Sequence, residues 1–125
     1  MPRGAPAREN DTWYLLNNNL GYSLNRIGRH AEAEAYCRAA IAIHAGRYNA
    51  YKNLGLSLEG QGRLFEAARC FLKAAKAAPD DLRALGHFED LLARHEEFAQ
   101  DNPEFVKVVQ EFCDEVRISR REAVM

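Results

Sequence analysis

Residues 48–81, YNAYKNLGLSLEGQGRLFEAARCFLKAAKAAPDD, decide the fold, because residues 14–47 are a second version of the same 34-residue unit. Laid over each other without a gap, the two stretches share eleven residues. The identical pairs are Tyr14/Tyr48, Asn19/Asn53, Leu20/Leu54, Gly21/Gly55, Ser23/Ser57, Leu24/Leu58, Gly28/Gly62, Arg29/Arg63, Glu32/Glu66, Ala33/Ala67 and Ala40/Ala74. A fixed period of about 20–50 residues predicts a stacked-repeat architecture, in which each unit buries its apolar face against its neighbour.

The shared small residues fall where two packed helices need them. Gly21 and Gly55 lie in the middle of expected helices, where glycine costs about 1 kcal/mol relative to alanine. We therefore expect another helix to approach the backbone closely at both positions. Alanines recur seven residues apart, which suits a tight seam between antiparallel helices. They are Ala33, Ala40, Ala67 and Ala74. Gly28 and Gly62 predict the turn within each unit, and Pro79 predicts the end of the second.

This pattern resembles the tetratricopeptide repeat (TPR). The second unit matches the motif in type at Tyr51, Leu54, Gly55, Leu58, Gly62, Ala67, Phe71, Ala74 and Pro79. The first unit departs from the motif at Asn17, Cys37 and Ala45. The resemblance implies an all-α protein, an α-solenoid of antiparallel helix pairs. We expect these helices at about residues 13–27 with 31–44 and 48–61 with 64–78.

The two full units are followed by a divergent one. Residues 82–118 begin in phase, but Glu89 and Glu96 stand where the glycines of the repeat should be. We expect a helix at about residues 82–98 and a last helix opened by Asn102 and Pro103. The last helix carries an apolar stripe of Phe105, Val108, Val109, Phe112 and Val116. This stripe predicts a capping pair that shields the second repeat.

The sequence predicts little fixed structure at either terminus. Residues 1–11 contain two prolines, a glycine and scattered charges, which predict a flexible arm. Asp11 or Thr12 is the expected N-cap of the first helix. Residues 119–125 predict a frayed tail. The repeats themselves therefore occupy residues 12–81.

The composition excludes several classes of partner. The chain has 125 residues, a net charge of −1 and a pI of about 6.4, so no overall field would attract nucleic acid or anionic lipid. Its apolar runs are far below the roughly 18 residues of a membrane span, and its N-terminus lacks the apolar core of a secretion signal. Three cysteines without an export signal suit a reducing, cytoplasmic location. We expect neither nucleic acid nor a membrane as a partner.

Catalysis is not expected either. The histidines show no metal-ligand or catalytic spacing, and no Cys-x-x-Cys occurs. Cys37 falls in the aromatic position that faces the seam, so its expected role is packing and not nucleophilic chemistry. The sequence predicts neither an enzyme nor a bound cofactor or metal.

The expected function lies on a surface. In stacked helical hairpins the first helix of each pair lines the concave face, so helical spacing predicts the side chains of a groove. They are Asn18, Asn19, Tyr22, Arg26, Asn49, Lys52, Asn53, Leu56, Arg83 and His87. Amides can pair with the backbone of an extended peptide, and Lys and Arg can attract a carboxylate. This predicts a non-catalytic module that binds a peptide or protein segment. The alternative is an ordinary solvated helix face.

Two other functions stay open. Two full repeats fall short of the roughly three that a stack usually needs, so the chain is also a candidate self-associating structural protein. Such a homodimer would bury either the last helix, at residues 105–116, or the N-terminal edge at Trp13. A regulator that binds RNA or a small ligand is the third class, and the near-neutral charge disfavours it.

Overall fold

The structure, a computed structural model, describes residues 7–124, with side chains described from residue 9 to residue 123. Seven helices and no strand occur in this part of the chain. They are α1 (Ala7–Arg26), α2 (His30–Ile43), α3 (Tyr48–Gly60), α4 (Leu64–Ala77), α5 (Arg83–Arg94), α6 (Glu96–Asp101) and α7 (Pro103–Val124). The prediction of an all-α solenoid is confirmed.

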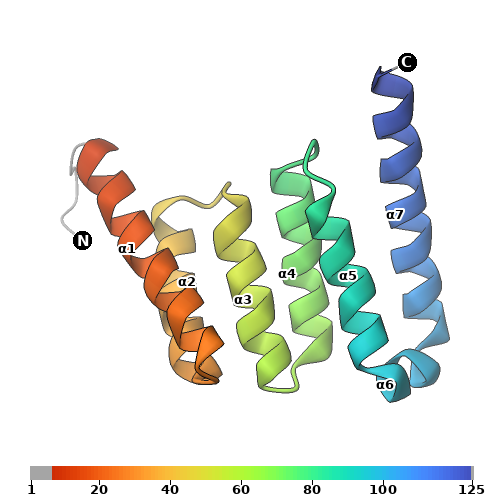
Figure 1. Ribbon diagram of the computed structural model, residues 1–125, viewed down its shortest axis with the longest axis horizontal. Helices are drawn as coiled ribbons and strands as arrows, with labels where there is room; N and C mark the ends of the chain where they lie inside the picture. Colours follow the sequence, from red (N-terminus) through yellow and green to blue (C-terminus); the bar gives the residue numbers. More distant parts are fainter. Residues whose placement is uncertain (1–6, 125) are drawn as a thin grey trace.

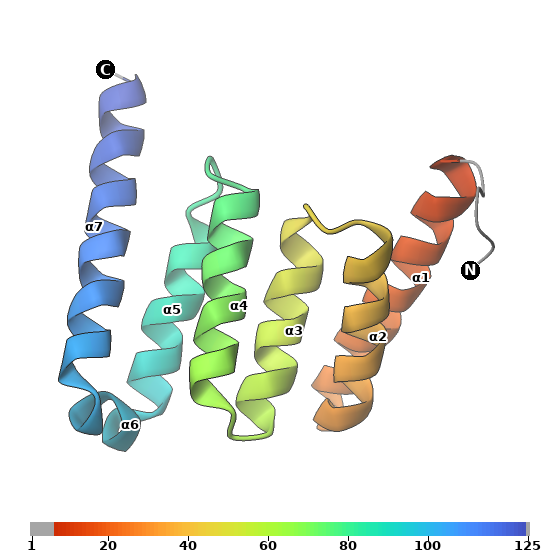
Figure 2. The ribbon, with the colours of Figure 1, turned by 180° about the vertical axis from the view of Figure 1, so that it is seen from behind.

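The helices follow one another as antiparallel neighbours in a single row (Figure 1). In that view α1, α3 and α5 stand in front, with α2 and α4 behind them; Figure 2 shows the opposite side. We call the front the α1–α3–α5 face. The row begins with α1 and ends with α7, so within residues 7–124 each end helix has a neighbouring helix on one side only.

The predicted glycines lie at the turns and at the seam between paired helices. Gly28 and Gly62 adopt φ angles of 82° and 77°, a left-handed conformation that ends α1 and α3 and that other residues rarely adopt. A Cβ atom on Gly55 would lie 2.5 Å from the ring of Phe71, and one on Gly21 would lie 2.5 Å from Cys37 Sγ. The four predicted seam alanines are fully buried. Each helix pair therefore packs at near backbone contact.

The N-terminal helix begins earlier than predicted. Residues 7–11, expected to belong to a flexible arm, are helical, whereas residues 1–6 lie outside the described part of the chain. Asp11 is not a helix cap. Its carboxylate accepts hydrogen bonds from His44 at 2.9 Å and from Arg47 at 3.0 Å. These contacts tie the first turns of α1 to the end of α2, which the local sequence of the arm does not indicate.

The C-terminal part also differs from its prediction. The helix expected at residues 82–98 ends at Arg94, and the short α6 follows, so seven helices replace the predicted six. The expected tail is helical as far as Val124, and Met125 lies outside the described residues. Arg117 pairs with Glu89, and Arg120 lies 3.6 Å from Asp80. These ion pairs connect the last turns of α7 to earlier parts of the chain.

Most of the predicted apolar stripe of α7 packs on the preceding helices, but Val108 is 62 % exposed. Val109 and Cys113 are buried, and Phe112 lies edge-on to Phe88 of α5 with 6.1 Å between the ring centroids. Phe65 of α4 contacts the ring of Phe105 at 5.2 Å. Aromatic contacts therefore hold the divergent third pair against the second repeat.

Candidate functional site

A hollow of about 630 Å³ opens on the α1–α3–α5 face, where the C-terminal halves of these three helices converge. It is lined by Tyr22, Asn25, Arg26, His30, Leu56, Glu59, Gly60, Arg94 and His95. Three of the predicted groove residues, Tyr22, Arg26 and Leu56, lie here. The hollow is the most suitable place on this face for a ligand side chain.

Two cations lie close to the ring of Tyr22. Its side chain is 44 % exposed, Arg26 Cζ lies 5.7 Å from the ring centroid, and Lys52 Nζ lies 5.6 Å from it. Arg26 also donates a 3.3 Å hydrogen bond to the Tyr22 hydroxyl. An aromatic ring with two cations close to it offers apolar contact and positive charge at one place.

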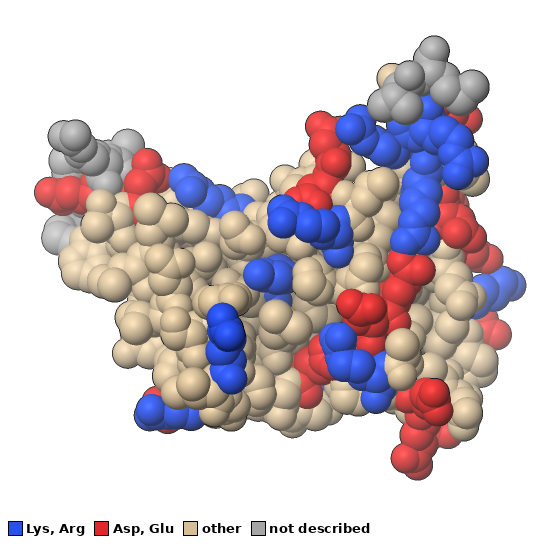
Figure 3. All heavy atoms as spheres, viewed as in Figure 1, with Lys and Arg blue, Asp and Glu red and all other residues tan. Residues whose placement is uncertain are grey.

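Neither of these cations is neutralised by an acidic group in the described part of the protein. Lys52 is half-buried, and burial lowers the pKa of its ammonium group from the usual value. Figure 3 shows Lys and Arg atoms over the C-terminal part of α1 and over α3, without acidic atoms among them. A carboxylate bound here would meet an uncompensated positive charge.

The prediction that Asn18 and Asn53 line the groove needs correction. Both side chains are buried, with exposed fractions of 8 % and 2 %, and Asn53 Nδ2 donates to Asn18 Oδ1 at 2.9 Å. Asn25 of α1 donates to the Asn53 carbonyl at 2.9 Å, and its own Oδ1 lies 3.0 Å from Ser57 Oγ. These amides hold α1 against α3 and are not available to a ligand.

Asn19 and Asn49 keep free amides on the surface. Both are exposed, and neither side chain makes a hydrogen bond within the described residues. Leu15, which the sequence reasoning missed, is 50 % exposed seven residues before Tyr22 and shares its side of α1. Leu15 could have been predicted from the sequence, because it lies two helical turns before Tyr22.

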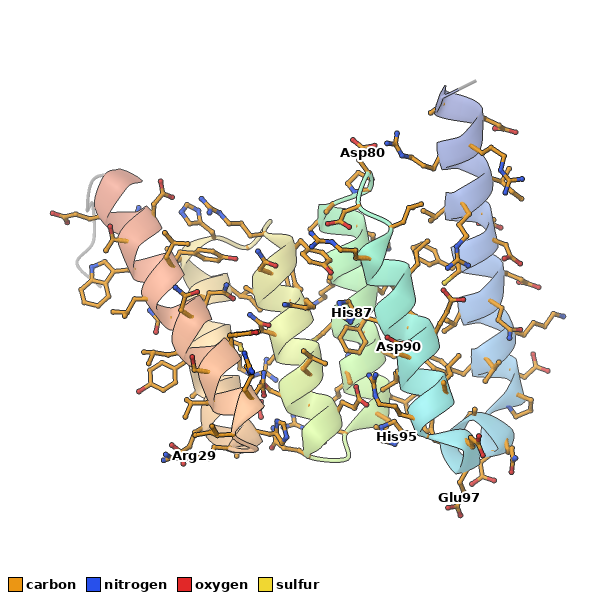
Figure 4. All side chains as sticks on the ribbon, viewed as in Figure 1. Arg29, Asp80, His87, Asp90, His95 and Glu97 are labelled. Atoms are coloured by element: carbon orange, nitrogen blue, oxygen red, sulfur yellow. The ribbon has the colours of Figure 1, made fainter. Side chains whose placement is uncertain are left out.

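Arg83 and His87 have partners inside the protein. Arg83 Nε donates to Asp81 Oδ1 at 2.9 Å, and its guanidinium lies 5.6 Å from the ring centroid of Tyr48. His87 projects from α5 toward α3 (Figure 4), where its Nε2 lies 3.2 Å from the Tyr48 hydroxyl. Its ring also stacks on Phe71 at 5.4 Å. Burial, with the nearby positive charge of Lys52, lowers the pKa of His87, so this side chain adds no charge near neutral pH.

One end of the hollow is closed by an ion-pair cluster that the sequence did not reveal. The Glu59 carboxylate accepts hydrogen bonds from Arg94 at 2.7 and 2.8 Å and from His95 Nε2 at 2.8 Å. Burial alone would raise the pKa of Glu59, but these hydrogen bonds lower it. Arg94 and His95 were missed because the helix was expected to continue to Phe98. The end of α5 turns both side chains toward α3.

The thiols take no part in this face. Cys37 and Cys113 are buried in the core, and burial raises the pKa of the Cys37 thiol to about 11. A thiol with so high a pKa stays protonated near neutral pH and is a poor nucleophile.

Comparison with known families identifies the helix pairs. Residues 48–81 match one tetratricopeptide repeat profile, and residues 18–45 match another. A search among curated proteins finds no match. No helix in the described range is long and apolar enough to cross a membrane. Repeats of this kind are typically non-catalytic and suggest a protein-interaction module. Residues 18–81 therefore form two repeats of the tetratricopeptide family.

Proposed function

We propose that the α1–α3–α5 face binds an extended acidic segment of a partner protein and seats one of its apolar side chains in the hollow. One observation carries the proposal. Arg26 and Lys52 lie close to the exposed ring of Tyr22, without acidic partners among the described residues, beside a hollow that Leu56 also lines. The ring and Leu56 suit an aliphatic or aromatic side chain, and the two cations suit carboxylates on either side of it.

The free amides support an extended conformation of the bound segment. Asn19 and Asn49 each offer one donor group and one acceptor to a peptide backbone. Few such contacts fit on a face of this length, so we expect an affinity on the order of micromolar. Asn18, Asn53 and His87 contribute to the shape of the face and not to direct contacts.

The test is selection from a display library of random twelve-residue peptides on the wild type and on the Arg26→Gln/Lys52→Gln variant. Wild type should enrich peptides with Asp or Glu next to a large apolar residue, and the double variant should lose this enrichment. Lys107→Gln is the matched control, because Lys107 is exposed on α7 and lacks an ion pair among the described residues. It should leave the selected sequences unchanged.

Isothermal titration of a selected peptide then measures the contacts. A charge-assisted hydrogen bond contributes about 1.5–3 kcal/mol, so each single variant should weaken binding about tenfold or more. Replacing Glu by Gln in the peptide should weaken it similarly. The proposal is wrong if the library yields no acidic peptides, or if the double variant binds the selected peptide with unchanged affinity.

A further inference from the structure

The first helix carries an exposed apolar ridge on the side of the row where it has no neighbouring helix. Trp13, Leu16, Leu20 and Ile27 are 43 %, 49 %, 38 % and 65 % exposed. They are three, four and seven residues apart, so Trp13, Leu16 and Leu20 lie on one face of α1. Ile27 comes just after the end of α1, where its N–H still donates to the Ser23 carbonyl at 3.3 Å. We call these four residues the α1 ridge.

The second repeat shows how the positions of the α1 ridge are packed when a helix pair precedes them. Moving 34 residues along the chain places Leu16, Leu20 and Leu24 on Ala50, Leu54 and Leu58 of α3. These three α3 residues are only 0 %, 4 % and 1 % exposed. Ala50 packs in a cluster with Ala40 and Ile43 of α2, the second helix of the preceding repeat. Leu16 and Leu20 of the α1 ridge therefore occupy positions that the preceding helix pair covers in the second repeat, whereas Trp13 and Ile27 correspond to Arg47 and Gln61, which are exposed there as well.

The opposite end of the row is mostly charged, although Val108 and Ile118 of α7 are 62 % and 52 % exposed. The exposed side chains of α7 include Glu104, Lys107, Glu111, Asp114 and Glu115. A charged outer face is typical of a capping helix and opposes association with an apolar ridge. Head-to-tail stacking of copies is therefore disfavoured, and a symmetric contact between two α1 ridges remains.

We propose that the α1 ridge binds the α1 ridge of a second copy of this chain, with the two helices antiparallel and Leu20 near the twofold axis. Trp13 and Ile27 each lie seven residues from Leu20, so this arrangement places Trp13 of one copy beside Ile27 of the other. Leu16 similarly meets the less exposed Leu24.

Opposed helix dipoles favour the antiparallel orientation. Trp13 and Ile27 are 14 positions apart in the sequence, which corresponds to about 21 Å along a helix. An interface of this length is at the small end of specific contacts, so the dimer should form at micromolar concentrations.

This contact uses a different side of α1 from Tyr22 and Arg26, so it does not depend on the proposed peptide site. Sedimentation velocity from 2 to about 200 μM should show monomers converting to dimers in this concentration range. Trp13 is the only tryptophan of the chain, so its fluorescence emission should shift to shorter wavelength over the same range.

Leu20→Glu should weaken the dimer at least tenfold and abolish the concentration-dependent emission shift. Ile118→Glu is the matched control, because Ile118 is 52 % exposed on α7. It should leave both readouts unchanged. Circular dichroism establishes that each variant is folded.

Cross-linking tests the orientation in the otherwise wild-type chain, whose three cysteines are buried. Under mild oxidation Leu20→Cys should form a disulfide-linked dimer, whereas Ile118→Cys should not. A mixture of Trp13→Cys and Ile27→Cys should form the heterodimer in preference to either homodimer. A chain that is monomeric at all concentrations overturns the proposal. A dimer that Leu20→Glu leaves intact also overturns the proposal. The proposal is equally wrong if the tryptophan emission shifts only after a protein of another sequence is added.

Discussion

Leu20 and Leu54 occupy the same position of the two repeats, yet 38 % of Leu20 is exposed and only 4 % of Leu54. Asn19 and Asn53 differ in the same way, since the first amide is exposed and the second is buried against Asn18. The two repeats are alike as units but not in their surroundings. α3 has a helix pair on each side, whereas α1 begins the row (Figure 1). Position in the stack therefore decides whether a shared residue belongs to the core or to a surface.

Replacement of the seam glycines should show the largest difference between the repeats. A side chain on Gly55 meets three ring atoms of Phe71 within 2.9 Å, whereas one on Gly21 meets the single Sγ atom of Cys37 at 2.5 Å. Gly55→Leu should lower the free energy of unfolding by more than about 3 kcal/mol, and Gly21→Leu by less. Urea unfolding followed by circular dichroism measures both. Equal losses would mean that the seams are equally tolerant.

The paired leucines should separate the core from the edge. Leu54→Ala leaves a cavity in a closed interface and should cost about 3 kcal/mol of stability. Leu20→Ala should cost less than about 1 kcal/mol at micromolar or lower concentrations, where the ridge faces water. Urea unfolding followed by circular dichroism, repeated at two protein concentrations, measures both losses of stability. A large concentration-independent loss for Leu20→Ala would show that α1 is more enclosed than its exposure indicates.

The paired asparagines should differ in the same direction but by less. Asn53→Ala leaves the buried Asn18 amide without its partner, which should cost about 1–3 kcal/mol. Asn19→Ala should leave the melting temperature nearly unchanged, because its amide is exposed and makes no hydrogen bond within the described chain. Thermal unfolding followed by circular dichroism measures the melting temperatures of both variants. The assignment of Asn53 to the interior fails if both variants melt with the wild type.

His87 stands 34 residues after Asn53 and extends the comparison to a third unit. Its pKa is lowered in the folded protein by burial, so the unfolded chain takes up a proton at higher pH than the native one. Stability from the neutral ring is complete above the unfolded pKa of about 6.5 and is lost as pH falls through the lower native pKa. Wild type should therefore lose more stability than His87→Asn between pH 7.5 and 5.

The difference in unfolding free energy between the two proteins, measured by urea titration at each pH, isolates this group. A difference that does not change with pH would mean that His87 titrates alike in both states.

Much of the fold was predictable because it depends on local sequence. The 34-residue period, Gly28 and Gly62 identified the pairs α1–α2 and α3–α4, and Pro103 marked the start of the last helix. The end of α5 was not predictable in the same way. His95 interrupts the helix where its ring and Arg94 reach Glu59 of α3, a contact across 35 or 36 residues.

The candidate site was only partly accessible from sequence. Helical spacing placed Tyr22, Arg26 and Leu56 on a common face but could not tell Asn19 from Asn53. Nor could it show that Arg83 is neutralised by Asp81. These differences depend on neighbours that are remote in the chain.

By itself the sequence determined the unit: its period, its two helices, the turn glycines and the small residues at the seam. These features follow from steric limits on the backbone and from apolar spacing, which act within one repeat. Tertiary structure alone decided which copies of the shared residues are buried, which charges are paired and which face is open. Burial and pairing are set by what lies next to a side chain in space, and in a short stack that differs from one repeat to the next.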